Sequence, residues 1–406
     1  MAVPKLRFKE FDGDWSEKII SDIADVRGGK RLPKGYSLVE SDTGYPYITV
    51  TDMEDGTVNC DKIRYVPLDA VDQIKRYRIT VDDIYISVAG TLGLVGIIPH
   101  ELNNANLTEN ADKLTNIKCD QKYLLQYLNN GSLSQLIDSV STVGAQPKLA
   151  LYAIQGMSIF LPANPEQTKI ASFLSAVDEK ISQLTQKHEL LSQYKQGMMQ
   201  KLFSQQIRFK ANDGSEFGEW EEKPLIEITS KASGKNKDGS VTEVLTNSAT
   251  KGIIKQSDYF DREIVTESNL NGYYIVNIDD FVYNPRISVH APVGPIKRNK
   301  QCLGVMSPLY TVFKITQGNL TYLEYFFDSN FWHDYVKSVA NSGARHDRMN
   351  ITNKDFFDMP VLYPSLEEQT KIANFLSAID QKIEVVAQQI EQAKQWKKGL
   401  LQQMFV

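Results

Sequence analysis

The sequence predicts an α+β fold in which two similar globular heads are joined by two long helices. These helices are expected to form an antiparallel intramolecular coiled coil, with a pseudo-two-fold arrangement. The first observation is a repeat, because EQTKIASFLSAVDEKI at 166–181 returns as EQTKIANFLSAIDQKI at 368–383. The second is that apolar residues recur every seven residues through both copies, as they do in coiled coils. The third is that a long stretch of short β-branched runs, turns and helical segments precedes each copy.

The composition is that of a globular protein with more than one domain. Its 406 residues are 42% hydrophobic and 23% charged, and a chain of that length suits two or three domains. No apolar run approaches the roughly 20 residues needed to span a bilayer, and the start, MAVPKLRFKEF, lacks the apolar core of a signal peptide. We therefore expect a cytoplasmic protein with no membrane partner.

Cysteine and histidine usage argues against a disulfide framework and against a metal site. The cysteines, at 60, 119 and 302, are far apart, and none lies in a CxxC motif. The histidines are scattered and form no HExxH motif. The net charge of −5 argues mildly against nucleic-acid binding unless the basic residues cluster, because affinity for DNA depends on phosphate neutralisation.

The repeat extends beyond the helices and divides the chain into four segments. Residues 166–203 align with 368–405 without a gap. Weaker similarities precede them: KYLLQYL from Lys122 resembles TYLEYFF from Thr321, and LRFKEFDGDW from Leu6 resembles IRFKANDGSEFGEW from Ile207. We therefore predict four segments: a first head at 1–164, a central helix at 165–205, a second head at 206–364 and a C-terminal helix at 365–406.

Each head is predicted to be α+β. Runs of β-branched and aromatic residues predict strands at 45–53, 77–88 and 94–99 in the first head, and at 241–247, 273–284 and 309–315 in the second. One helix in each head, at 121–140 and at 320–339, completes the pattern. The Asp pairs at 82–83 and 279–280 suit a turn or cap role better than acid–base catalysis.

The repeated segment is predicted to be a helix of about 38 residues, roughly 57 Å long at 1.5 Å per residue. Pro165 opens the first copy, as proline can at an early helical position. The apolar residues that recur every seven positions form a seam along one face of this helix. One helix cannot bury its seam alone, so the seams of the two copies should pack against each other. The polar seam residues His188, Lys195 and Lys397 are expected to pack their stems and extend their polar ends into solvent. The apolar seam residues are Ile170, Leu174, Val177, Ile181, Leu184, Leu191, Met198, Leu202, Ile372, Leu376, Ile379, Ile383, Val386, Ile390, Ala393, Leu400 and Met404.

No motif in the chain predicts catalysis. SVAGTLGLVG at 87–96 has glycines after a predicted strand, but neither the GxxxxGK[ST] of a phosphate loop nor the GxGxxG of a dinucleotide site. NPRISVHAPVG at 284–294 begins like the NPP[YF] corner of amino-methyltransferases, but it lacks the second proline and the aromatic residue. We predict that both stretches are strand–turn–strand loops.

Basic and amide side chains gather at equivalent places in the two heads. VRGGKRLPKG at 26–35 and SKASGKNKDG at 230–239 are cationic, glycine-containing loops that suit phosphate contact. Arg, Asn and Gln can also make bidentate bonds to base edges. Solvation explains any one cluster equally well, but the same location in both heads with different side chains favours recognition. The candidate DNA-binding residues are Arg27, Lys30, Arg31, Lys34, Arg76, Arg78, Ser87, Thr91, Gln146, Lys148, Lys231, Lys235, Lys237, Asn284, Arg286, His290, Lys297, Arg298, Arg345, His346 and Arg348.

The layout resembles the specificity subunit of Type I restriction–modification systems. The resemblance rests on the two EQTKIAxFLSAxDxKI segments, each of which follows a short proline-bearing strand, SIFLPANPEQ at 158–167 and MPVLYPSLEEQ at 359–369. The GA(Q/R) stretches upstream and SVAGTLGLVG also look like target-recognition domains of that family. NPRISVHAPVG departs from the glycine-rich loop, so the resemblance implies no loop role there.

The resemblance implies a subunit that is not itself catalytic. Each head would read one half of a split, asymmetric site in double-stranded DNA. The helices would set the distance between half-sites and dock two methyltransferase subunits, to which restriction subunits with motor and nuclease activity are added. S-adenosylmethionine, ATP and magnesium would belong to those partners, and this chain would hold no cofactor. Two alternatives stay open: a two-headed protein-interaction scaffold without DNA binding, and a self-sufficient methyltransferase.

Overall fold

The computed structural model describes residues 3–140, 148–231, 234–258, 267–341 and 347–406. The chain divides into two compact units: unit 1 is residues 1–186 with 387–406, and unit 2 is residues 187–386. Each unit contains one head and part of both long helices, and each is described by itself. The four segments predicted from the repeat stay a prediction.

Unit 1 contains the first head, which is built on two four-stranded sheets. The strand order is β2-β9-β6-β7 in one sheet and β4-β3-β8-β5 in the other, and a two-stranded sheet, β1-β10, precedes the first long helix. Only the β3–β8 pairing is parallel among these described strands. The strands are β1 Ser16–Ile19, β2 Asp25–Gly28, β3 Pro46–Ile48, β4 Arg64–Tyr65, β5 Arg78–Ile79, β6 Ile84–Ser87, β7 Val95–Gly96, β8 Ala105–Leu107, β9 Ala111–Thr115 and β10 Ser158–Leu161. The helices are α1 Ile20–Ile23, α2 Val71–Ile74, α3 Gln121–Tyr127, α4 Leu133–Val140 and α5 Leu151–Gln155.

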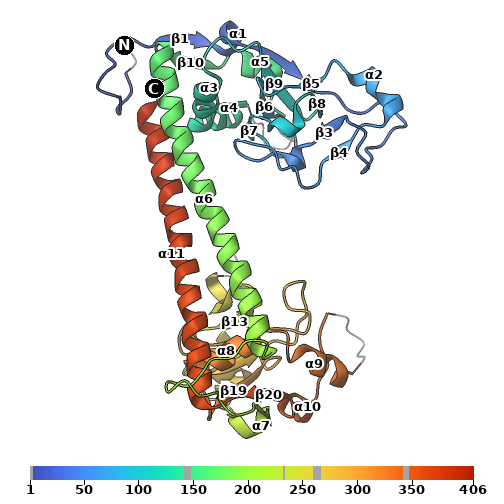
Figure 1. The fold of residues 1–406 in the computed structure, drawn as a ribbon, viewed down its shortest axis with the longest axis vertical. Helices are drawn as coiled ribbons and strands as arrows, with labels where there is room; N and C mark the ends of the chain where they lie inside the picture. Colours follow the sequence, from blue (N-terminus) through green and yellow to red (C-terminus); the bar gives the residue numbers. More distant parts are fainter. Residues whose placement is uncertain (1–2, 141–147, 232–233, 259–266, 342–346) are drawn as a thin grey trace. The chain divides into compact units, whose positions relative to one another are not determined.

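The core of unit 1 joins the β2-β9-β6-β7 sheet to the long helices. Ile86 of β6 and Leu114 of β9 belong to one buried cluster with Leu174 and with Met404 near the end of the chain. Within this cluster the ring of Tyr123 in α3 lies edge-on to Phe405, with ring centroids 5.4 Å apart, and Figure 1 shows α3 beside the long helices. The last residues of the chain therefore belong to the core of the first head.

Unit 2 contains the second head and repeats the central sheet of the first. The order β12-β19-β16-β17 corresponds to β2-β9-β6-β7, and β11-β20 corresponds to β1-β10, whereas the remaining strands form separate pairs, β13-β14 and β15-β18. The strands are β11 Glu221–Pro224, β12 Thr229–Lys231, β13 Leu245–Ser248, β14 Gly252–Lys255, β15 Tyr274–Val276, β16 Phe281–Tyr283, β17 Ile296–Arg298, β18 Gly304–Met306, β19 Thr311–Ile315 and β20 Pro360–Tyr363. The helices are α7 Leu225–Ile228, α8 Leu320–Asp328, α9 His333–Val339 and α10 Asn353–Phe357.

Four of the predicted elements are interrupted in the structure. The predicted strand at 77–88 is two strands, β5 and β6, because Asp83 accepts a hydrogen bond from the Thr80 amide and closes a turn between them. Asp280 closes the equivalent turn between β15 and β16 by accepting from the Asn277 amide, which confirms the turn role of both Asp pairs. The predicted helix at 121–140 is kinked at Gly131, whose φ is 106°, and the helix at 320–339 is divided into α8 and α9.

The repeated segments form the long helices α6, Asn164–Phe203, and α11, Leu366–Met404. All twenty predicted seam positions, polar ones included, are buried or half-buried. In unit 1 the start of α6 shares its core with the end of α11, and in unit 2 the end of α6 shares its core with the start of α11. In each unit the two helices therefore lie side by side and run in opposite directions (Figure 1).

The polar seam lysines differ from the prediction. Lys195 Nζ lies 2.6 Å from an oxygen of Asp380 in unit 2, and Lys397 Nζ lies 2.6 Å from an oxygen of Asp178 in unit 1. Their side chains are only 21% and 20% exposed. The ammonium groups are paired across the helices rather than solvated, because an Asp of the partner helix lies at the same level.

Candidate DNA-binding surface

Each head is fixed to its helices by the same pair of charged residues. Arg7 donates to both carboxylate oxygens of Glu166, at 2.7 and 2.8 Å, and Arg208 donates to both oxygens of Glu368, at 3.0 and 2.7 Å. Both glutamates are buried. The hydrogen bond to its glutamate raises the pKa of each arginine. Such bidentate pairs fix orientation as well as adding energy.

The next residue of the repeat, Gln, connects each helix to α3 or α8. Gln167 donates to the Pro162 carbonyl and accepts from the Asp120 amide at the start of α3. Gln369 repeats both bonds with Pro364 and Asn319 at the start of α8. The EQ of the repeated sequence thus positions the heads, a role that the sequence analysis did not assign.

A β-hairpin in the first head carries the glycine-rich stretch at 87–96. Strands β6 and β7 pair antiparallel, as predicted for this stretch. The Ser87 hydroxyl accepts from the Leu94 amide at 2.8 Å, and Ser87 is fully buried. The Leu149 amide donates to the Val88 carbonyl and connects this hairpin to the segment that follows residue 147. Thr91 is exposed at the turn.

The second head presents a longer hairpin at the equivalent place. Strands β16 and β17 pair antiparallel, and the Met349 amide donates to the Pro285 carbonyl, as Leu149 does to Val88 in the first head. Asn284 is buried, and its side-chain nitrogen donates to the Asn247 carbonyl at 3.0 Å. Beyond it, Arg286 and His290 are exposed.

The cationic loop of the first head is held by backbone contacts that require glycine. The Gly29 amide donates to the Ala111 carbonyl and the Lys30 amide to the Leu107 carbonyl, and a Cβ on Gly29 would lie 2.0 Å from the Thr108 oxygen. The side chains of Lys30 and Lys34 are exposed. The backbone therefore fixes where these charges emerge.

Two arginines of that loop are paired with carboxylates. Arg31 Nε lies 2.5 Å from Glu109, and Arg27 lies 2.8 Å from Asp25. Burial opposes the charged form of Glu109, but the hydrogen bonds from Arg31, Thr108 and the backbone and the charge of Arg31 together outweigh burial and lower the pKa of Glu109. Only Nε of Arg31 is used in this pair and the side chain is 78% exposed, so its other N–H groups can reach a phosphate while Glu109 offsets part of its charge.

The basic residues of the second head divide in the same way. Lys231, Lys235 and Lys237 are exposed, whereas Lys297 pairs with Asp328 at 2.6 Å. Arg298 contacts both Asp279 and Glu324. The exposed lysines are thus better placed for phosphate contact than the paired side chains are.

The remaining candidates differ in exposure, and one of them, Arg348, pairs through its backbone with Arg286. Arg76 and Lys148 are exposed, and Arg348 is half-buried. Arg78 lies over the ring of Tyr45, 5.3 Å from its centroid. Three candidates, Gln146, Arg345 and His346, lie outside the described residues.

Two candidates have placements that argue against base contact. Ser87 and Asn284 are buried and use their side chains inside the hairpins, so we leave both out of the proposed surface. The sequence analysis also missed Val289, which is 97% exposed at the turn of the β16–β17 hairpin. An apolar residue inside a predicted turn was the available signal, since an apolar side chain there has no core to enter.

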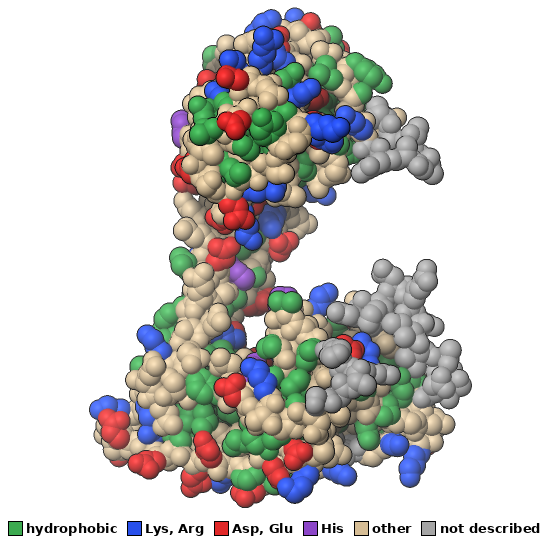
Figure 2. All heavy atoms as spheres, turned by 90° about the vertical axis from the view of Figure 1, so that its right-hand side faces the viewer, with side chains coloured by type: hydrophobic (Ala, Val, Ile, Leu, Met, Phe, Trp, Pro, Cys, Tyr) green, Lys and Arg blue, Asp and Glu red, His purple; other side chains and the backbone are tan. Residues whose placement is uncertain are grey.

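Charge on the surface is mixed rather than uniformly positive. On the faces in Figure 2, Lys and Arg side chains are interspersed with Asp and Glu. In the described part of the chain, no group of three or more His, Cys, Asp or Glu residues is arranged to hold a metal ion. Within the same residues, no helix combines the length and apolar character of a membrane span.

Comparisons with known proteins agree with this architecture. A family model described as Type I restriction modification DNA specificity domain matches residues 12–193 and 218–395. The putative type I restriction enzyme MjaX specificity subunit of Methanocaldococcus jannaschii is 26% identical, over 98% of this chain and 94% of its own length. The MjaVIII specificity subunit of the same organism is also 26% identical, over 97% of this chain and 94% of its own length.

Two solved structures share the fold. The S subunit of a Type-I restriction-modification system from M. genitalium superposes with a TM-score of 0.56 at 15% identity, covering 100% of this chain and 99% of its own. A chain solved in work on complex assembly and conformational transition of the type I R-M system gives 0.57 at 14% identity, covering 97% of this chain and 98% of its own. With the family match over both halves, the chain belongs to the family of Type I restriction modification DNA specificity domains and is a specificity subunit, not an enzyme.

Proposed function

We propose that each head reads one half of a split, asymmetric site in double-stranded DNA, and that α6 and α11 set the distance between the half-sites. A pseudo-two-fold relation between the heads would present them to the DNA in opposite orientations. Two heads on one chain bind bivalently, so the second contact is effectively intramolecular.

One observation carries this proposal: the contacts that fix the heads are repeated, whereas the exposed side chains on the hairpins and loops are not. Arg7–Glu166 corresponds to Arg208–Glu368, but exposed Thr91 at one hairpin turn corresponds to exposed His290 and Val289 at the other. We call the repeated contacts at the base of each head, Arg7–Glu166 and Arg208–Glu368, the shared support. Two heads with the same support but different exposed side chains are what the reading of two different half-sites requires. Exposed lysines nearby supply sequence-independent phosphate contacts.

The proposed phosphate contacts are tested by salt-titrated binding. The target is first mapped by sequencing the methylated bases in a strain that carries this chain and its methyltransferase. Lys237→Gln should then weaken DNA binding at every sequence and lower the salt slope by about 1, with Lys18→Gln, an exposed lysine on β1, as the control. Binding that is insensitive to salt would contradict the proposal.

For the methyltransferase subunits we propose two equivalent docking patches on the long helices. In unit 1 a groove of about 620 Å³ lies between the helices and is bordered by Phe173, Lys180 and Trp396, which is 54% exposed. In unit 2 the residues equivalent to Phe173 and Trp396 under the 202-residue shift are Phe375 and Tyr194, and Tyr194 is 51% exposed. Two similar patches suit two copies of one partner.

The docking proposal predicts a change in stoichiometry. Trp396→Ser or Tyr194→Ser should each remove one methyltransferase copy, and the double variant both, as counted by native mass spectrometry. Tyr152→Ser, at a more exposed aromatic residue of the first head, is the control. Unchanged stoichiometry in the double variant would exclude these patches.

The remaining partners follow from the same proposal. Restriction subunits would join the complex that the methyltransferase subunits form with this chain. S-adenosylmethionine, ATP and magnesium would be held by those partners and not by this chain. The complex would act in the cytoplasm, where the DNA is, and would need no membrane.

A further inference from the structure

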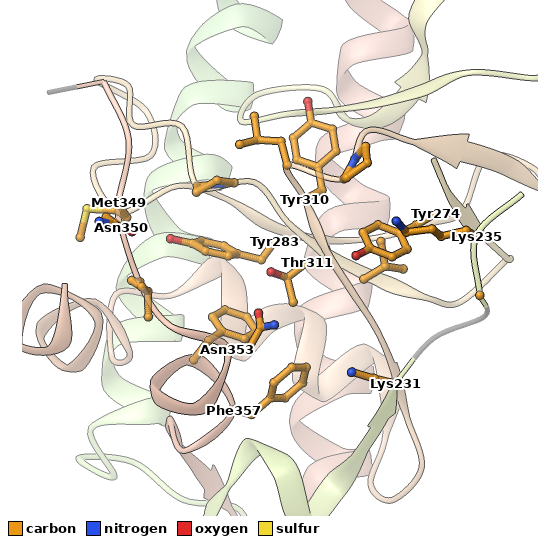
Figure 3. A pocket seen from close by; sticks show the side chains of 17 residues that line it. Lys231, Lys235, Tyr274, Tyr283, Tyr310, Thr311, Met349, Asn350, Asn353 and Phe357 are labelled. Atoms are coloured by element: carbon orange, nitrogen blue, oxygen red, sulfur yellow. The ribbon is translucent and has the colours of Figure 1, made fainter. Parts of the chain in front are cut away.

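The second head contains a pocket of about 480 Å³, and the proposed DNA contacts involve only its lysines. It is lined by Lys231 and Lys235 of the cationic loop, by Pro285 at the base of the hairpin, and by Met349 and Asn350. These are the elements that carry the proposed DNA-binding residues. The pocket is therefore next to the proposed reading surface, and Figure 3 shows Lys231, Lys235, Met349 and Asn350 around it.

Aromatic side chains form much of the wall of this pocket. The rings of Tyr283 and Phe356 are stacked on each other, with centroids 4.8 Å apart and an angle of 20° between their planes, and Phe357 lies beside them. Tyr274 and Tyr310, both half-buried, line other parts of the wall. Because Tyr283, Phe356 and Phe357 are buried in the core of unit 2, the half-buried rings of Tyr274 and Tyr310 are the ones with surface left to stack on a planar ring.

The charged and polar groups of the pocket are cationic or neutral. Lys231 and Lys235 are exposed, and neither forms an ion pair within the described part of the chain. The described lining residues include no Asp or Glu, whereas Thr311, Asn350 and Asn353 offer hydroxyl and amide groups. A ligand with a planar ring, hydrogen-bonding edges and a negative charge matches all three features.

The first head keeps only part of this aromatic wall, because Tyr77, six residues before Asp83, corresponds to Tyr274, six residues before Asp280, whereas Ile86 corresponds to Tyr283. Tyr283 pairs with Thr311 across β16–β19, as Ile86 pairs with Asp112 across β6–β9. Ile86 is fully buried in the core of unit 1. The ring of Tyr283 is therefore particular to the second head, whereas the ring of Tyr274 has a counterpart in the first.

We propose that this pocket binds a single nucleotide, with the base against the aromatic wall and the phosphate beside Lys231 and Lys235. The nucleotide comes either from solution or from the DNA bound to the second head, where one nucleotide leaves the stack. Only the second source rests on the proposed function. Stacking on protein aromatics can offset the free energy needed to extract a base from the duplex.

The test has one arm for each source and uses the full chain. In the first arm, AMP, GMP, CMP and TMP are titrated into the chain by calorimetry without DNA. In the second arm, 2-aminopurine replaces each base of the second half-site in turn, and its fluorescence reports unstacking when the chain binds. We expect saturable mononucleotide binding or a rise in fluorescence at one position.

Three variants connect the signal to the pocket. Lys231→Gln, Lys235→Gln and Tyr310→Ala should each weaken the signal about five- to 100-fold, the range expected for one lost stacking or phosphate contact. Lys237→Gln, on the same loop but outside the pocket lining, should leave the mononucleotide titration unchanged. Circular dichroism checks that each variant is folded.

The inference is overturned if neither arm gives a signal while the chain still binds its DNA, or if the signal survives in all three pocket variants. If the chain without any substitution does not bind DNA, that result would instead contradict the proposed function. The mononucleotide arm would then still decide whether the pocket binds a nucleotide.

Discussion

The hairpin of the first head turns through residues 88–94, whereas the equivalent hairpin of the second head turns through residues 284–295. The shorter one has glycines at positive φ, Gly90 and Gly93, and the longer one exposes Val289 at its turn. Yet both are connected at the same point, by the Leu149–Val88 and Met349–Pro285 hydrogen bonds. The difference teaches that each hairpin is held by backbone contacts at its base. The length of the hairpin and the side chains at its turn can therefore vary without loss of those contacts.

The largest effect is expected from exchanging one head. Residues 16–157 are replaced with the matching part of another specificity subunit. Arg7 and Glu166 lie outside the exchanged segment, so their ion pair is kept. Because the support contacts of the second head lie in unit 2, the exchange should change one half-site completely and leave the other unaltered. Methylome sequencing checks this, and the reciprocal exchange of residues 221–359 is the control. If either exchange altered both half-sites, the claim that each head reads one half-site independently would be wrong.

The second effect concerns the shared support. Arg7→Ala and Arg208→Ala each leave a buried glutamate without its arginine. Both should lower the free energy of unfolding by about 2–3 kcal/mol, since an uncompensated buried charge is costly. Denaturant titration measures the change. Lys210→Ala, which removes the exposed pair with Glu216, should leave the free energy of unfolding nearly unchanged, because exposed ion pairs contribute little. A large difference between Arg7→Ala and Arg208→Ala would show that the two supports are not equivalent.

The third effect is a difference in stability cost between alanine substitutions at two neighbouring glycines of the first head. A Cβ on Gly29 would lie 2.0 Å from a backbone oxygen, whereas one on Gly28 would meet only Asp112, at 3.4 Å. Gly29→Ala should therefore displace the cationic loop and cost about 2 kcal/mol of stability, with loss of DNA contact by the first head alone. Gly28→Ala should cost less than about 1 kcal/mol. Equal costs in thermal unfolding would indicate that the loop can move away.

The smallest effect is expected at Asp112, the position that is Thr311 in the second head. Burial raises the pKa of Asp112, although the nearby Lys148 opposes this. The folded state thus binds the proton more tightly than the unfolded chain, so ionisation lowers stability as the pH rises through the raised value. Asp112→Asn should raise stability at pH 7 by no more than about 1 kcal/mol, and this gain should disappear below pH 3.8, the ordinary pKa. A gain that persists at low pH would assign the effect to packing instead of charge.

Much of the fold that carries the candidate surface could be predicted, because the sequence patterns that indicate it are local or repeated. A seven-residue period identifies a helix seam without any knowledge of the rest of the fold, and all twenty seam positions are at least half-buried. The duplication located two heads, and the Asp pairs were assigned to turns. The broken elements were missed because runs such as 77–88 are apolar on both sides of a turn that one aspartate closes.

The candidate surface could be predicted only in part, because the partners of a charged side chain are distant in sequence. Arg31 and Glu109 are 78 residues apart, so a count of cations along the chain cannot tell a paired arginine from an available one. Ser87 and Asn284 were among the predicted DNA-binding residues, but the hairpins use their side chains internally.

The sequence alone determined that this protein has two heads, two long seamed helices and unlike loops, since periodicity and duplication are properties of residue order. Only the tertiary structure decided which cations are exposed, which polar residues are buried and where the aromatic side chains of the second head leave a pocket. Those outcomes depend on which distant segments meet, and packing between sheets and helices brings them together.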